Sequence, residues 1–217
     1  MIDLHMHTLF SDGAYVPSEL AYRAKVAGYH TIAITDHIDY SNYDFIIPRI
    51  VEISKIISVH YDMKVIPGVE LSYVPPNLIH DLTKSVKAAG AKLVVVHGET
   101  KHETVPEGTN LAAVKAGVDI LAHPGFLSEE EAKIAAKNNV RIEITTRSTH
   151  GKTNAQVAAA ARAFGAKMVM NSDTHIKDNF FTKELISQTL KDAGLEEVYF
   201  DFMQNNSLEL LHEIGVK

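Results

Sequence analysis

Residues 2–7 read Ile-Asp-Leu-His-Met-His, so that apolar and polar side chains alternate and the last polar residues form a His-x-His pair. Alternation with a period of two is typical of a β-strand, in which successive side chains point to opposite faces. One face of this strand would carry Asp3, His5 and His7. The apolar residues between them are expected to meet helices, so the polar face would look into the interior of a barrel.

Other short, largely apolar segments recur along the rest of the chain, and longer amphipathic segments lie between them. That pattern is typical of strand–helix units and a parallel sheet, and therefore of the α/β class. Seven strands are predicted at residues 2–7, 31–37, 64–70, 92–97, 119–123, 141–146 and 167–173. Helices are predicted at residues 17–29, 48–60, 77–89, 111–116, 128–139, 154–164, 182–193 and 207–214. A closed or nearly closed TIM-like barrel accounts for this order, and an open doubly wound sheet would give the same string.

Composition limits the possible functions. The chain has 217 residues, of which 46% are hydrophobic and 22% charged, and no linker-like segment interrupts it, so we expect one domain across residues 1–217. The absence of a long apolar run or leader predicts a cytoplasmic protein without a membrane partner. A net charge of -6 argues against an extended nucleic-acid surface but allows a small phosphorylated substrate. The sequence does not indicate an oligomeric state.

Histidines and carboxylates gather at the ends of the predicted strands, where parallel α/β folds build their sites. Six of the 12 histidines lie at such ends. In chain order these positions carry His5, His7, His37, Glu70, His97, His123, Glu143, Asp173 and His175. Burying so many ionisable groups together is costly unless cations neutralise them. With Cys 0 in the chain, the ligands would be imidazoles and carboxylates, which suit Zn, Mn or Fe.

Seven short segments match a known family in the family's order. They are residues 3–7 (DLHMH), 11–13 (SDG), 35–37 (TDH), 68–70 (GVE), 96–99 (VHGE), 122–124 (AHP) and 172–175 (SDTH). Each segment is weak alone, but their order along successive strands is specific. The chain resembles the PHP (polymerase and histidinol phosphatase) domain family from end to end. This resemblance implies a distorted seven-stranded β/α barrel and a metal-dependent phosphoesterase similar to histidinol phosphatase.

The resemblance also implies a two- or three-metal site, and no ligand position is missing. The first metal would take His5, His7, Glu70 and Asp173, the second Asp12, His37 and His175, and the third Glu70, His97 and His123. Glu70 would thus bridge two ions. Asp173, His175 and Glu70 would act in catalysis through these metals, which would lower the pKa of a bridging water and supply hydroxide for in-line attack on a phosphoester.

Other residues near these strand ends are expected to contact substrate or to support the metal ligands. Arg147 follows the sixth strand, and its guanidinium is expected to hold phosphate oxygens of the substrate. His150 in the same loop is a second candidate for contact with substrate. Asp3 and Asp36 are expected to support neighbouring residues by hydrogen bonds, and Glu143 either to bind a metal or to orient a ligand.

Three other functions compete with hydrolysis of a small phosphomonoester. A phosphodiesterase or nuclease acting on nucleic-acid ends is disfavoured by the charge. An amidohydrolase would also begin with a His-x-His strand, but it commonly has a lysine on its fourth strand, where this chain has His97. A non-catalytic, metal-stabilised binding module would need fewer ligands.

Overall fold

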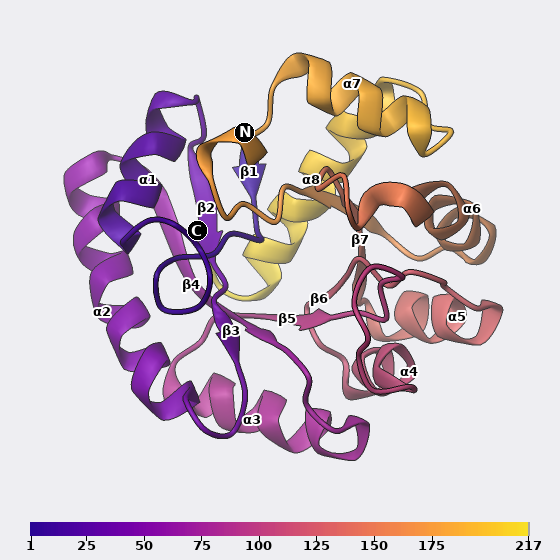
Figure 1. Ribbon diagram of the computed structural model, residues 1–217, viewed down its shortest axis with the longest axis horizontal. Coiled ribbons are helices and arrows are strands. Elements are labelled where there is room, and N and C mark those ends of the chain that lie inside the picture. Colours follow the sequence, from indigo (N-terminus) through magenta and orange to yellow (C-terminus); the bar gives the residue numbers. More distant parts are fainter. Residues whose placement is uncertain (217) are drawn as a thin grey trace.

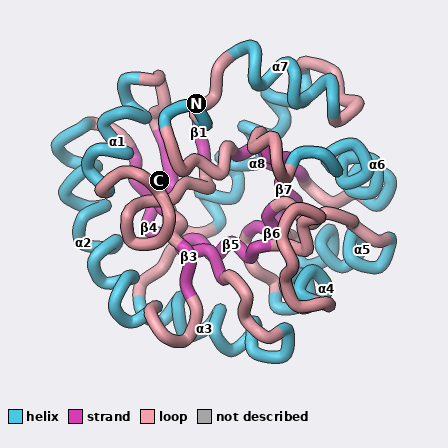
Figure 2. Tube along the Cα trace, in the orientation of Figure 1, coloured by secondary structure: helices cyan, strands magenta, loops and turns pink. Residues whose placement is uncertain are grey.

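The computed structural model describes residues 1–216, and in it the strands form a ring with helices outside (Figures 1 and 2). The strands are β1 (Ile2–Asp3), β2 (Thr31–Ile34), β3 (His37–Ile38), β4 (Lys64–Leu71), β5 (Leu93–His97), β6 (Ile120–Ala122), β7 (Arg141–Thr145) and β8 (Met168–Asn171). All pairings are parallel, in the order β1-β2-β4-β5-β6-β7-β8, and β3 pairs with β4. A parallel bridge between Met6 and Thr174 brings the two edges together, so the predicted barrel is confirmed and is nearly closed.

Two predicted strands are shorter or interrupted where side chains take some of the backbone hydrogen bonds. After β1, the backbone N–H of Leu4 donates to Asn171 Oδ1 and that of His5 to Asp3 Oδ1. The predicted strand at residues 31–37 is divided into β2 and β3. Between them, Thr35 Oγ1 accepts from the backbone N–H of Met6.

Eight α-helices surround the described strands (Figure 1). They are α1 (Pro17–Val26), α2 (Tyr43–Tyr61), α3 (Ile79–Ala89), α4 (Thr109–Ala116), α5 (Glu129–Asn138), α6 (Asn154–Phe164), α7 (Lys183–Asp192) and α8 (Val198–Glu213). Short 3-10 helices occupy Pro76–Leu78, Gly151–Thr153 and Lys177–Asn179. None of the helices in residues 1–216 combines the length and apolarity needed to cross a bilayer.

Two helices begin at least five residues before their predicted starts. Helix α2 starts at Tyr43 and contains Pro48, which the sequence placed at the helix start. A proline in the helix removes one hydrogen bond, and the burial of Ile46, Ile47 and Ile50 on the inner face offsets this loss. Helix α8 starts at Val198, not at residue 207, and Gln204 ties it to β1 by bonding both the N–H and the carbonyl of Ile2.

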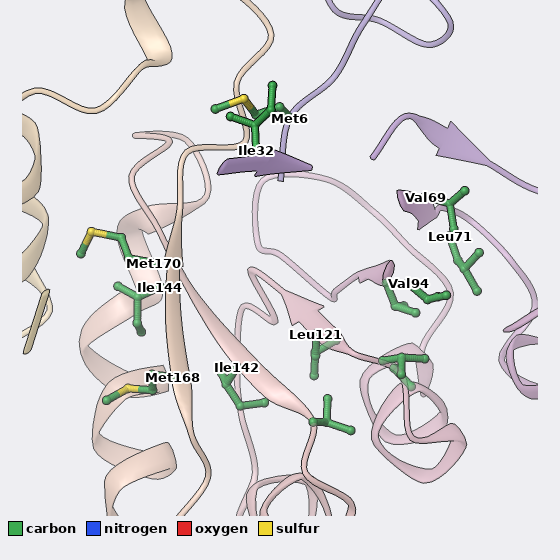
Figure 3. Close-up of a cluster of buried hydrophobic side chains, with 14 of the residues drawn as sticks. Met6, Ile32, Val69, Leu71, Val94, Leu121, Ile142, Ile144, Met168 and Met170 are labelled. Atoms are coloured by element: carbon green, nitrogen blue, oxygen red, sulfur yellow. The ribbon is translucent and has the colours of Figure 1, made fainter. Parts of the chain in front are cut away.

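Buried apolar side chains form two clusters. Successive residues of one strand belong to different clusters, because their side chains point to opposite faces of the sheet. The larger cluster joins the outward side chains of the strands to the helices, and Figure 3 labels Met6, Ile32, Val69, Leu71, Val94, Leu121, Ile142, Ile144, Met168 and Met170 from it. The smaller cluster contains Val95 and Val169, which alternate with those residues, together with Leu4 and with Leu210 and Leu211 of α8. Leu4 therefore does not share the cluster of Met6, because β1 ends at Asp3 and the strict alternation ends with it.

Candidate metal centre

A cavity of about 580 Å³ lies beside the carboxyl ends of the strands. Its lining includes six of the predicted metal ligands, namely Asp12, His37, His97, His123, Asp173 and His175. His5, His7 and Glu70 are completely buried beneath them. The structure thus brings all nine predicted ligands to one end of the barrel, since every one of them lies close to at least two others.

Imidazole nitrogens and carboxylate oxygens of the predicted ligands face one another at distances of 2.7 to 3.9 Å. His5 Nε2 lies 3.3 Å from Glu70 Oε1, His7 Nε2 3.1 Å from Asp173 Oδ1, and His175 Nε2 3.0 Å from Asp12 Oδ1. Two atoms that each bind a cation at about 2.1 Å are separated by about 3.0–3.4 Å at tetrahedral or octahedral angles. The spacing of these pairs therefore fits ligands that share a cation.

Several of these atoms are buried and make no hydrogen bond of good geometry, although His37 Nδ1 lies 2.7 Å from Glu70 Oε2. They are His5 Nε2, His7 Nε2 and both carboxylate oxygens of Glu70. An unpaired buried polar atom is costly, so their convergence calls for a neutralising group. A donor set of nitrogen and oxygen atoms in this arrangement fits divalent cations.

The groups that the structure forms agree with the predicted sets and add links between them. His7, Asp12, His37 and His175 offer ligand atoms within 4.8 Å of one another, as do Glu70, His97 and His123. His7 thus also stands beside the set predicted for the second metal. A further group of this kind combines His123 with His150 and Asp173.

The backbone is strained at two of these positions. His123 has a φ of 26° and Asp173 a φ of 52°, in a region that residues other than glycine seldom adopt. His123 follows β6 directly. If the strand continued regularly, its side chain would point to the same side as Leu121, toward the helices, and not to the side of Ile120 and Ala122. The positive φ turns the chain here and accompanies a side chain that faces the cavity. Such strain persists where the surrounding structure holds a functional residue in place.

Burial and the close carboxylates shift the pKa values in opposite directions. Burial lowers the pKa of His7 and of His123 well below the usual histidine value. Burial also lowers the pKa of His37, but the Glu70 carboxylate outweighs it and raises that pKa to about 9. For Glu70 itself burial raises the pKa, and the charges of His5 and His37 more than reverse this, leaving it well below the usual value. Opposite charges of neighbouring side chains thus offset part of the cost of burial in this cluster.

Arg147 reaches the cluster, as the sequence predicts. Its Nη1 lies 3.0 Å from Asp173 Oδ2 and 2.6 Å from His175 Nδ1, and its side chain remains 27% exposed to the cavity. His150 is buried, lies on the same cavity, and stacks on His123 with ring centroids 4.5 Å apart. Both residues are therefore placed to meet a molecule that enters the cavity.

Carboxylates next to the cluster fix its geometry. Glu143 Oε2 lies 2.8 Å from His5 Nδ1, which orients that ring. Asp36 accepts hydrogen bonds from the Thr8 backbone, the Thr8 hydroxyl and the Ser11 hydroxyl, so it holds the loop that carries Asp12. Asp3 accepts from the backbone N–H groups of His5 and Ser172.

Glu103 and Tyr73, two residues of the cavity lining that contact His97, were not predicted from the sequence. Glu103 Oε2 lies 3.2 Å from His97 Nε2, and the Tyr73 hydroxyl lies 3.4 Å from the same carboxylate oxygen. Both residues stand in loops that follow strands, where no periodicity marks an inward side chain. The general tendency of such loops to carry functional residues was the one available signal.

Comparisons with known proteins identify relatives of the whole chain. A sequence model described as PHP domain matches residues 3–201. An uncharacterized protein of Methanocaldococcus jannaschii is 44% identical over 195 residues, which is 89% of each chain. A probable phosphatase of Enterobacter sp. strain 638 is 26% identical over 242 residues, covering 99% of this chain and 95% of that protein.

Two solved structures of low sequence identity share the fold. A chain in the cryo-EM structure of archaeal ribonuclease P with mature tRNA superimposes with a TM-score of 0.72 at 17% identity, covering 97% of this chain and 90% of that one. Histidinol phosphate phosphatase from Lactococcus lactis, crystallised with zinc, L-histidinol and phosphate, gives a TM-score of 0.65 at 15% identity, covering 90% and 94%. At these identities the likeness extends to the fold alone.

Proposed function

This chain belongs to the PHP domain family, and from this we propose that it is a metal-dependent phosphoesterase that hydrolyses a small phosphomonoester. The observation that carries the proposal is the set of buried, unpartnered nitrogen and oxygen atoms of His5, His7 and Glu70. The probable-phosphatase relative supports the same class of reaction.

The ligands are proposed to hold two to three divalent cations, of Zn, Mn or Fe. His5, His7, Glu70 and Asp173 would bind the first, Asp12, His37 and His175 the second, and Glu70, His97 and His123 the third. When bound, closely spaced cations of this kind lower the pKa of a water between them and make hydroxide available near neutral pH. Glu70 is suited to the bridging position because Oε2 lies 3.5 Å from His7 Nε2 of the first set and Oε1 lies 3.7 Å from His123 Nε2 of the third.

The remaining residues position the substrate. The Arg147 guanidinium presents several N–H donors, so it is proposed to turn from Asp173 and His175 toward the equatorial oxygens of the phosphoryl group. His150 Nδ1 is held by the Thr100 hydroxyl at 2.8 Å, which leaves Nε2 facing Asp173 and the cavity for contact with substrate.

The cavity lining favours a small substrate over a long polyanion. Arg147 is the one lysine or arginine among the described residues that line it, whereas Asp39, Asp12 and Glu103 bring carboxylates to the same lining. A nucleic-acid strand would place successive phosphates beside these carboxylates, and like charges repel. A single phosphoryl group needs to contact only the centre of the cavity.

The test is release of inorganic phosphate from a panel of phosphomonoesters, with dinucleotides included for the nuclease alternative. Metal-stripped protein is reconstituted separately with Mn, Zn and Fe. Asp173→Asn should lose turnover, and asparagine tolerates the positive φ at this position. Asp62→Asn is the matched control, because Asp62 also has a positive φ but lies at the end of α2.

Metal-dependent phosphate release that Asp173→Asn abolishes and Asp62→Asn retains would support the proposal. Bound metal without turnover on any phosphoester would favour an amidohydrolase-like or non-catalytic role. Failure of the protein to bind metal would overturn it.

A further inference from the structure

Glu103 is not one of the nine predicted ligands, but its carboxylate lies beside two histidines of the cavity. It belongs to the loop at residues 98–108 after β5, and its side chain is 34% exposed at the cavity. Its carboxylate reaches inward to two histidines, with Oε2 3.2 Å from His97 Nε2 and Oε1 3.6 Å from His150 Nε2. Glu103 is thus a carboxylate carried to the cluster by a loop.

The His97 ring is oriented so that a ligand nitrogen faces this carboxylate. Nδ1 of His97 lies 3.1 Å from the carbonyl oxygen of Gly98, to which it can donate its hydrogen. Nε2 is then the nitrogen left to bind a cation. The same ring lies in the group with Glu70 and His123, whose ligand atoms are within 4.8 Å of one another. Glu103 therefore approaches His97 at its metal-binding atom.

The separation of the two atoms is similar to that of two pairs of predicted ligands in the cluster. The 3.2 Å between His97 Nε2 and Glu103 Oε2 falls between the values for His7 with Asp173 and for His5 with Glu70. It also falls within the range of about 3.0–3.4 Å expected for two atoms that share one cation.

The position of Glu103 is supported from both sides. The Tyr73 hydroxyl lies 3.4 Å from Glu103 Oε2, and the Tyr73 ring stacks on His97 with centroids 6.0 Å apart. Tyr73 has a φ of 57°, a strained value for a side chain of this size. At the base of the loop, Glu99 Oε1 accepts from the backbone N–H of Asn110, at 2.9 Å. These contacts hold the carboxylate in place before any cation binds.

We propose that Glu103 is an additional ligand of the cation held by Glu70, His97 and His123, and that Tyr73 positions it. This rests on the proposed function, because it concerns the same metal centre. The carboxylate adds a negative charge at the side of the third site that opens to the cavity, whereas the Glu70 carboxylate is completely buried. Its role is to strengthen binding of this cation.

The experiment measures metal binding directly. Metal-stripped protein is titrated with Zn²⁺ and with Mn²⁺ by calorimetry, and the metal retained after dialysis is counted by mass spectrometry. Glu103→Gln keeps the size of the side chain and an oxygen that can accept hydrogen bonds, but removes the charge. His97→Ala identifies the affected site, and Glu107→Gln is the matched control, because Glu107 is an exposed carboxylate in the same loop.

His97→Ala should remove one metal site. We expect Glu103→Gln to lower the metal affinity of that same site by on the order of tenfold or more, as changes around metal ligands do. Glu107→Gln should bind like the wild type. Tyr73→Phe should weaken the same site by a smaller factor. In Co²⁺-substituted protein, Glu103→Gln should also change the visible absorption bands, which report the ligand set.

Equal or tighter binding by Glu103→Gln would overturn the inference, since Glu103 would then be only an ion-pair partner of His97 that the cation displaces. If the wild type shows metal-dependent phosphate release at the same time, the proposed function stands and this inference alone fails. If the wild type retains no cation, both fail.

Discussion

Glu143 Oε2 lies 2.8 Å from His5 Nδ1, and both side chains are completely buried inside the barrel. The contact fixes the His5 ring so that its other nitrogen, Nε2, points at Glu70 Oε1, 3.3 Å away. Asn171 Nδ2 donates to the same Glu143 oxygen at 2.9 Å and fixes the carboxylate in turn. A strand residue far from His5 in sequence therefore determines which of its nitrogens faces the other predicted ligands.

Glu143→Gln should weaken metal binding while the fold remains. The amide keeps the shape of the carboxylate but loses its charge, and loss of such a partner behind a metal-binding histidine typically lowers affinity by about 10- to 100-fold. Calorimetric titration with Zn²⁺ measures the effect, and circular dichroism checks the fold. Glu209→Gln, a partly exposed carboxylate paired with Lys167, is the control. Unchanged affinity in Glu143→Gln would remove Glu143 from the metal centre.

Removal of metal should destabilise the protein. A cation that binds the native state and not the unfolded chain stabilises it by about 2.7 kcal/mol when its free concentration is 100 times the dissociation constant. In the absence of metal, the unpartnered atoms of His5, His7 and Glu70 remain buried at a cost. Thermal unfolding with a chelator should therefore show a lower Tm than with Zn²⁺ or Mn²⁺. Identical melting curves would contradict a metal centre at this position.

Arg147→Ala should impair substrate binding without loss of metal. Hydrogen bonds to a charged group contribute about 1.5–3 kcal/mol, which corresponds to a fall in kcat/KM of roughly 10- to 100-fold. Phosphate release measures the kinetics, and metal analysis after dialysis checks the centre. Arg162→Ala, a substitution on α6, is the control. Loss of bound metal in Arg147→Ala would mean that Arg147 supports the ligands themselves.

Gly125→Ala should be more destabilising than Gly165→Ala. Both glycines have positive φ values, 70° and 76°, so each substitution introduces backbone strain of roughly 1–2 kcal/mol. A Cβ at Gly125 would in addition meet the backbone of Glu99 and Thr100, whereas a Cβ at Gly165 would meet nothing within 4 Å. Urea unfolding compares the two variants. Equal losses would indicate that the loop at residues 98–108 moves aside freely.

The fold could be predicted from sequence because its signals are local. Alternating side chains and the longer amphipathic segments after them predict the strand–helix units, and β4 to β8 lie close to their predicted positions. The same logic predicted that eight of the nine ligands meet at one side of the barrel, because parallel strands end there, whereas Asp12 came from the family resemblance. The predicted element boundaries were wrong where contacts with residues distant in sequence determine the local structure. Helix α2 runs through Pro48, and Thr35 replaces a strand pairing with its hydroxyl.

The sequence by itself determined which residues stand at the strand ends, because strand periodicity and chain order are written in it. Only the tertiary structure decided how these side chains meet. The contact of Glu143 with His5 spans 138 residues and exists because β1 and β8 close the ring. The turn at His123 and the approach of Glu103 to His97 depend on loop conformations that have no repeating pattern, so packing against the rest of the barrel sets them.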